Sequence, residues 1–167
     1  MDNKKLCHSE KAEEIFKSGY NCAQAVVAAF ADDYGLDEAM ALRIASSFGG
    51  GMGRMREVCG AFSGLLIING LETGNLDGSA EAKKKNYEAV QHLAEEFKLR
   101  SGGSIICREL LGLDKDKDGK VKDSEPTPTK RTQTYYKKRP CIELIKDACE
   151  IIETELLNYR AEGQGRI

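Results

Sequence analysis

Apolar residues recur every three or four positions along most of this chain, which is the spacing of amphipathic helices. Glycines such as Gly19, Gly35 and Gly102 separate the periodic stretches. The pattern predicts helices over residues 9–17, 21–34, 37–45, 58–71, 82–99 and 140–159, and a short helix over residues 104–111. Strict apolar–polar alternation, the pattern of half-buried strands, is scarce. We therefore predict an all-α fold, a single-domain helical bundle of about six helices over residues 1–167.

Two segments interrupt the helical pattern. Residues 49–53 read GGGMG, a run in which a regular helix is unfavourable. Residues 114–139 are charged, rich in Thr and Lys, and contain two of the three prolines, so we predict a long loop insertion before the last helix. Within the predicted helix 58–71, the small residues Gly60, Ala61 and Gly64 would let another helix or a cofactor approach the backbone closely.

The composition narrows the class of protein. At 167 residues the chain has the size of one domain with its own core. Its formal charge is −2, without the basic excess usual in nucleic-acid binders, so we expect no DNA partner. Apolar runs such as Leu65 to Ile68 are too short to span a membrane, and the first residues lack the apolar stretch of a secretory signal. We therefore expect a cytoplasmic protein whose cysteines stay reduced.

Six cysteines offer the clearest chemistry in this chain. Cys22, Cys59 and Cys141 fall in the first turn of predicted helices, and Cys107 falls one turn after Ser104, which could cap the short helix. Helix N-termini favour the thiolate form of cysteine. A bundle could bring these four thiols together, and reduced thiolates at one site would bind a metal or do redox work. The wide spacing, without the Cys-x-x-Cys pair usual in structural zinc sites, leaves open that they are small buried apolar residues.

The two remaining cysteines fit other roles. Cys149 shares a helix face with Ile145 and Ile152, which favours a place in the core. Cys7 lies near the N-terminus, where we expect it to be exposed.

Four short motifs accompany Cys22, Cys59, Cys107 and Cys141. They are GYNCAQAV at residues 19–26, FGGGMGR at 48–54 followed by CGAFSG at 59–64, CRELLG at 107–112, and PC at 140–141. Their order and content resemble the C_GCAxxG_C_C family of redox-active proteins, from residue 19 to the last helix. The family label spells Gly-Cys-Ala where this chain reads Cys-Gly-Ala, and we treat the two as one motif.

The resemblance implies a small helical protein with a redox role, whose relatives are often described as similar to split-Soret cytochromes, which associate haem with an iron–sulfur centre. It implies that Cys22, Cys59, Cys107 and Cys141 hold an iron–sulfur cluster, which we expect to be [2Fe–2S], with backbone N–H groups of residues 49–53 available to the sulfurs. The chain has no Cys-x-x-Cys-His, so covalent haem is not expected. Such a protein would carry single electrons or sense redox state.

Two alternatives to the cluster remain open at this point, and with them the question of whether the protein is an enzyme. Two of the four cysteines could instead cycle between dithiol and disulfide without a metal, with a helix-start cysteine such as Cys59 as the attacking thiolate. The protein could also be a non-catalytic interaction module whose zinc or calcium site only maintains its shape.

Residues 114–125, DKDKDGKVKDSE, fit the calcium-loop template. The predicted ligands are Asp114, Asp116, Asp118, the carbonyl of Lys120, and Glu125. Pro126 and Pro128 argue against the exiting helix of a full EF-hand, and no second hand occurs in the sequence. We therefore expect at most an isolated Ca²⁺ loop that orders the insertion, with a solvated acidic–basic turn as the alternative.

A basic segment follows, in which Lys130, Arg131, Lys137, Lys138 and Arg139 surround two tyrosines. We expect a solvated surface here, with docking of an acidic redox protein as the functional alternative. The sequence does not identify that redox partner, and it leaves a homodimer open.

Overall fold

The computed structural model describes residues 7–74 and 76–157, and it confirms the predicted all-α fold. The described residues form no β-strand and only two isolated bridges. They contain six helices of eight residues or more, as the periodicity predicts: α1 (His8–Lys17), α2 (Cys22–Ala29), α3 (Glu38–Ala45), α5 (Gly60–Thr73), α6 (Ala80–Ser101) and α9 (Cys141–Ile151). Shorter helical segments are η1 (Asp32–Tyr34), η2 (Ser46–Phe48), α4 (Gly49–Met52), α7 (Cys107–Leu110), α8 (Gln133–Lys138) and the π-helical η3 (Ile152–Leu157).

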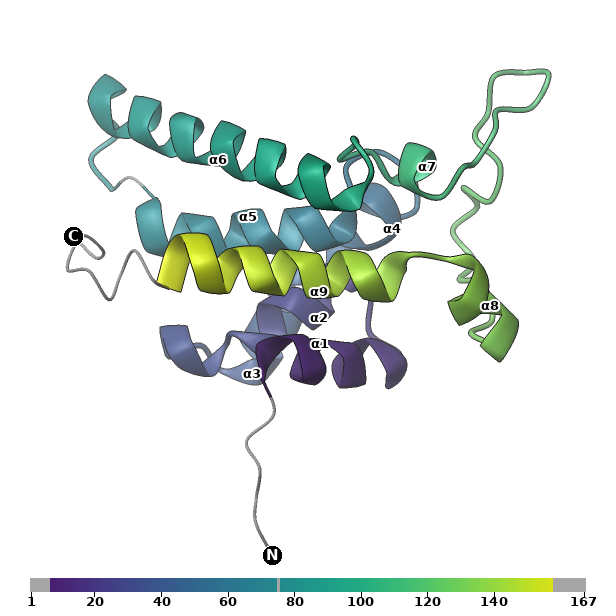
Figure 1. Cartoon of the computed structure of the whole chain (residues 1–167), viewed down its shortest axis with the longest axis horizontal. Helices are drawn as coiled ribbons and strands as arrows, with labels where there is room; N and C mark the ends of the chain where they lie inside the picture. Colours follow the sequence, from purple (N-terminus) through teal and green to yellow (C-terminus); the bar gives the residue numbers. More distant parts are fainter. Residues whose placement is uncertain (1–6, 75, 158–167) are drawn as a thin grey trace, which may run out of the picture.

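Helix α2 lies at the centre of the bundle because apolar side chains cover almost its whole circumference. It packs against α1, α3, α5 and α9. Figure 1 shows α5 and α9 as a middle layer, with α6 on one side and α1, α2 and α3 on the other. The core between these layers is built mainly from alanine, isoleucine, leucine and phenylalanine side chains.

The small residues of α5 allow the close helix contact that the sequence predicts. A Cβ atom on Gly64 would lie 2.8 Å from the Cβ of Val26 in α2. On its other side, α5 contacts α6 through Phe62 and Phe97, whose ring centroids are 5.3 Å apart. Helix α5 is therefore held between α2 and α6 by one small residue and one aromatic pair.

Several predicted boundaries need correction. The prediction that residues 114–139 are a loop is wrong in part, since α8 forms within them, and the side chain of its N-cap Thr132 accepts a hydrogen bond from the backbone N–H of Tyr135 (3.2 Å). Helix α5 begins at Gly60 rather than residue 58, because Val58 pairs with Ile106 in an antiparallel bridge. The predicted end of the last helix, residue 159, lies outside the described residues.

The short segments gather at one end of the bundle. In Figure 1, α4, α7, α8 and the first turn of α9 all lie at the right-hand end, near the start of α5 and the end of α6. This is the end at which the four motif cysteines are found. No helix in the described part of the chain is long and apolar enough to cross a membrane.

Candidate functional site

Four cysteines from four helix starts line one cavity of about 370 Å³. Cys22, Cys107 and Cys141 are each the first residue of a helix, and Cys59 is the N-cap of α5. The prediction that Cys107 lies one turn inside its helix is wrong, because Ile106, not Ser104, is the N-cap. Three of the four are buried, with 5% to 9% of their surface exposed, and Cys22 is half-buried. All four thiols therefore meet the positive end of a helix.

A short backbone ladder places Cys59 beside Cys107. The bridge between Val58 and Ile106 is flanked by two hydrogen bonds, from the N–H of Cys59 to the carbonyl of Ile105 (2.8 Å) and from the N–H of Cys107 to the carbonyl of Glu57 (2.6 Å). Residues separated by about 50 positions in sequence are thus fixed relative to each other by main-chain contacts.

A capping box orients Cys22. The side chain of Asn21 accepts a hydrogen bond from the N–H of Gln24 (3.0 Å), and the side chain of Gln24 accepts one from the N–H of Asn21 (3.0 Å). The remaining amide donors of these two side chains bind the carbonyls of Ser46 and Leu42. The NCAQ motif therefore both starts α2 and ties the start to the segment before the glycine run.

The glycine run at residues 49–53 and Gly60 in α5 bring backbone close to two of the cysteines. The run is not a regular helix, as predicted, because Gly50 and Gly51 have φ of 64° and 70°. A Cβ on Gly51 would lie 2.6 Å from the Cβ of Cys107, and one on Gly60 would lie 3.2 Å from the Cβ of Cys22. These glycines leave room that any other residue would fill.

The thiols differ in acidity. The contact between the Cys22 and Cys141 thiols raises the pKa of Cys22 and lowers the pKa of Cys141, and nearby arginines lower the latter further. Burial raises the pKa of Cys59 to about 12, although the backbone N–H groups of Phe62 and Ala61 oppose it. Burial also raises the pKa of Cys107, against the effect of Arg56. Without a bound cation, Cys141 is thus the most readily ionised of the quartet.

The charged side chains that line the cavity are all cationic. They are Arg54, Arg56, Arg131 and Arg139, and none of the described Asp or Glu residues lines it. Arg131 is fixed by the carbonyls of Phe16 and Tyr20 and by the ring of Phe16, 4.3 Å from its guanidinium carbon. The cavity therefore combines four thiols with four fixed positive charges, a setting that favours an anionic occupant.

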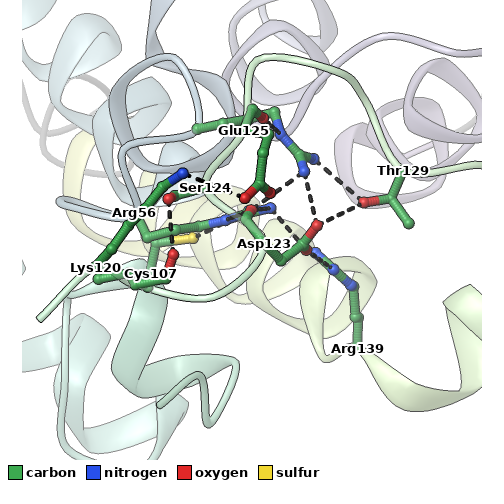
Figure 2. A network of polar contacts seen from close by, with 10 residues as sticks. Arg56, Cys107, Lys120, Asp123, Ser124, Glu125, Thr129 and Arg139 are labelled. Carbon is green, nitrogen blue, oxygen red and sulfur yellow. Dashed lines mark hydrogen bonds and ion pairs between the residues drawn. The ribbon is translucent and has the colours of Figure 1, made fainter. Parts of the chain in front are cut away.

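Behind the cavity wall, Asp123 of the insertion binds three of these arginines. Its carboxylate pairs with Arg54 (2.7 Å), Arg56 (2.9 Å) and Arg139, and its carbonyl accepts further hydrogen bonds from Arg54 and Arg56. Burial would raise the pKa of Asp123, but the three guanidinium groups outweigh it and hold that pKa below its ordinary value. Figure 2 shows this network, in which Arg56 also reaches the sulfur of Cys107, at 3.8 Å.

Comparison with known proteins agrees with this arrangement. A family model described as "Putative redox-active protein (C_GCAxxG_C_C)" matches residues 20–155, most of the chain. The chain belongs to this family. Neither the comparison with curated proteins nor the comparison with solved structures found a match.

In this C_GCAxxG_C_C protein, the sequence motifs identify the thiols but miss the charges around them. Arg131 and Arg139, expected as part of a solvated surface, are partly buried and face the cavity, whereas Lys130, Lys137 and Lys138 are exposed as expected. Asp123 occupies a position of the calcium-loop template that carries no ligand. Its carboxylate was therefore available for another role, which the sequence alone does not identify.

The predicted calcium loop forms a compact turn. One carboxylate oxygen of Asp116 accepts the backbone N–H groups of Asp118 and Lys120, both at 2.9 Å, and the carbonyl of Lys120 accepts the N–H of Asp116. The carboxylate of Glu125 pairs with the ammonium group of Lys120 (3.4 Å). The Ca²⁺ site stays a prediction, and in this arrangement several of its proposed ligands already have partners within the loop.

The two remaining cysteines behave as the sequence predicts. Cys149 is fully buried in the core, where burial raises the pKa of its thiol, and Cys7 is exposed. Within the described residues, no three cysteine, histidine or acidic side chains lie close enough to hold a single metal ion. The four thiols of the cavity are therefore not arranged around a single metal ion.

Proposed function

We propose that this protein is a one-electron redox protein in which Cys22, Cys59, Cys107 and Cys141 hold an iron–sulfur cluster. The observation that carries the proposal is the lining of one cavity by four thiols and four arginines, without a carboxylate. A [2Fe–2S] cluster with four thiolate ligands has a net charge of about −2, which such a cavity would compensate. When bound, the cluster would accept and release one electron at a time.

The arrangement of the thiols supports a cluster over a single ion. They form two pairs: Cys22 contacts Cys141, and Cys59 lies beside Cys107 through the backbone ladder. A [2Fe–2S] cluster needs two thiolates on each iron, and its ligands stand farther apart than those of one tetrahedral ion. Because Gly51 and Gly60 have no side chains, their backbone packs directly against Cys107 and Cys22 as part of the cavity wall.

The chain's own residues would then exclude water and balance charge. The insertion closes one side of the cavity through Pro126, Pro128 and Thr129, and the arginines stay in place through Asp123 and main-chain carbonyls. Positive charge beside such a cluster favours its reduced, more negative form, so the arginines of this lining would raise its reduction potential.

Anaerobic reconstitution tests the proposal. Purified protein incubated with ferrous iron, sulfide and a thiol reductant should retain about two irons and two acid-labile sulfides per chain and show a visible charge-transfer spectrum that dithionite bleaches. A colourless, iron-free protein after this treatment contradicts the proposal. Stoichiometric zinc without a redox couple would instead indicate a structural module.

A second candidate function rests on the contact between Cys22 and Cys141. These thiols could lose two protons and two electrons to form a disulfide, with a protein disulfide as the oxidant that is reduced to two thiols. Metal-free protein would be exposed to glutathione disulfide, trapped with acid and mapped by mass spectrometry. A Cys22–Cys141 bond formed reversibly and before any other favours this function, whereas random pairing or glutathione adducts on Cys7 alone count against it.

A further inference from the structure

Arg56 is a buried cation in direct contact with the thiol site. Its side chain is 2% exposed, which is rare for arginine. One terminal nitrogen donates to the sulfur of Cys107 at 3.8 Å, while Nε and the other terminal nitrogen bind the carbonyl and carboxylate of Asp123 at 2.7 to 2.9 Å. Figure 2 shows the guanidinium group between Asp123 and the sulfur. One side of the guanidinium group is thus anchored by Asp123, and the other side contacts the sulfur of Cys107.

The backbone around this contact is strained. Four non-glycine residues of the described chain have positive φ, and all four lie in the two segments that form this contact, residues 52–56 and the insertion. They are Met52 (60°), Arg54 (68°), Arg56 (62°) and Asp123 (59°). Left-handed backbone costs about 1–3 kcal/mol per residue and persists where the surroundings require it, often at functional sites. Both residues of the Arg56–Asp123 pair carry this cost, so the position of the guanidinium group is closely determined.

We propose that Arg56 is a positioning residue that raises the reduction potential of the four-cysteine site, with Asp123 holding its guanidinium group against Cys107. The inference deepens the proposed function and depends on it for the identity of the redox centre. Donor groups and positive charge at a cluster sulfur stabilise the reduced state, and their effect is large where water is excluded. A planar guanidinium group can bind sulfur and carboxylate together, which an ammonium group does less well.

The experiment compares midpoint potentials of the iron-loaded wild type, Arg56→Gln, Arg56→Lys and Arg108→Gln. Arg108 follows Cys107 directly, but its side chain pairs with Glu57 (3.0 Å) instead of the sulfur. Arg108→Gln removes a positive charge from the residue next to Cys107 without removing a contact to its sulfur, so it serves as the matched control. Iron content and circular dichroism are measured on every variant to confirm loading and folding.

We expect Arg56→Gln to lower the equilibrium constant for reduction at least tenfold, a fall of about 59 mV for a one-electron couple. Arg56→Lys should show a smaller fall, and Arg108→Gln should stay close to wild type. Equal potentials in wild type and Arg56→Gln overturn the inference, as does an equal fall in Arg108→Gln. If Arg56→Gln does not fold, Arg56→Lys decides, and a wild-type potential in that variant overturns the inference.

Failure of the proposed function gives a different result. If the wild type binds no iron, the same variants are titrated as a thiol–disulfide couple in glutathione buffers. Arg56 lines the same cavity as Cys22 and Cys141 and donates to the sulfur of Cys107, so its positive charge should stabilise the reduced thiols. Arg56→Gln should then shift the couple about tenfold towards the disulfide, or about 30 mV lower. An unchanged couple in that assay overturns the inference.

Discussion

Gly51 packs so tightly against Cys107 that a Cβ atom on the glycine would lie 2.6 Å from the Cβ of the cysteine. The same atom would also lie 2.8 Å from the backbone nitrogen of Glu57, and Gly51 has φ of 70°. Only glycine satisfies both the left-handed backbone and the close approach. The glycine run is therefore part of the wall of the thiol cavity.

Gly51→Ala should destabilise the protein by about 2–4 kcal/mol, because left-handed strain adds to overpacking against α7. It should also reduce iron uptake in reconstitution. Gly112→Ala is the matched control, since Gly112 also has positive φ (61°) but open space around its Cβ position. That variant should lose about 1–2 kcal/mol and keep its iron. Urea unfolding measures both, and equal losses in the two variants would show that the contact with Cys107 does not matter.

Asp123 should make stability depend on pH in the acid range. Its pKa is lowered in the folded protein, so the unfolded chain takes up the proton first as pH falls. The contribution of the carboxylate is present above the unfolded pKa of about 4 and is lost as pH falls through the lower folded pKa.

Asp123→Asn should therefore cost about 1–3 kcal/mol at pH 7, and the difference from wild type should shrink towards pH 3. Asp32→Asn serves as the control, because its ion pair with Lys11 is exposed and should contribute roughly 0.5 kcal/mol or less. Urea unfolding across pH decides. A difference that stays constant between pH 7 and pH 3 would mean that the arginines do not depend on the ionised carboxylate.

Asn21 should affect both the stability of α2 and the retention of iron by the four-cysteine site. Asn21→Ala removes the N-cap of α2 and should cost about 1 kcal/mol. Ser79→Ala removes the N-cap of α6, at a similar cost, but α6 carries no site cysteine. We expect both variants to unfold at lower urea concentration, and only Asn21→Ala to release iron faster to a chelator. Equal release rates would indicate that the cap does not position Cys22.

Ca²⁺ should bind the 114–125 loop weakly, with a dissociation constant of about 0.1 mM or higher. The reason is that binding must break the pair between Lys120 and Glu125 and the backbone contacts of Asp116. Titration calorimetry on wild type and Asp118→Asn measures this. Tight binding, or identical heats in the two proteins, would contradict the expected site.

The sequence predicts the helices and the identity of the thiols because both leave local signals. Helical periodicity and capping residues mark the bundle, and the motifs mark each cysteine. The charge network is different, since Arg56 and Asp123 are 67 positions apart and their pairing depends on tertiary contact. The same holds for His8, an isolated residue in sequence, which bonds Asp33 and Glu153 and stacks on Phe30. Helix α8 has only six residues, and its two partly buried tyrosines, Tyr135 and Tyr136, are adjacent and not at helical spacing, so periodicity does not predict it.

Iron binding by single-cysteine variants tests most directly whether the four thiols share one centre. Each of the six cysteines is changed to Ala, and iron and sulfide per chain are measured after the same anaerobic reconstitution. Cys22→Ala, Cys59→Ala, Cys107→Ala and Cys141→Ala should each lose most of the iron or change the spectrum, while Cys7→Ala and Cys149→Ala should match wild type. Full iron and an unchanged spectrum in any of the first four variants would contradict a centre held by this quartet.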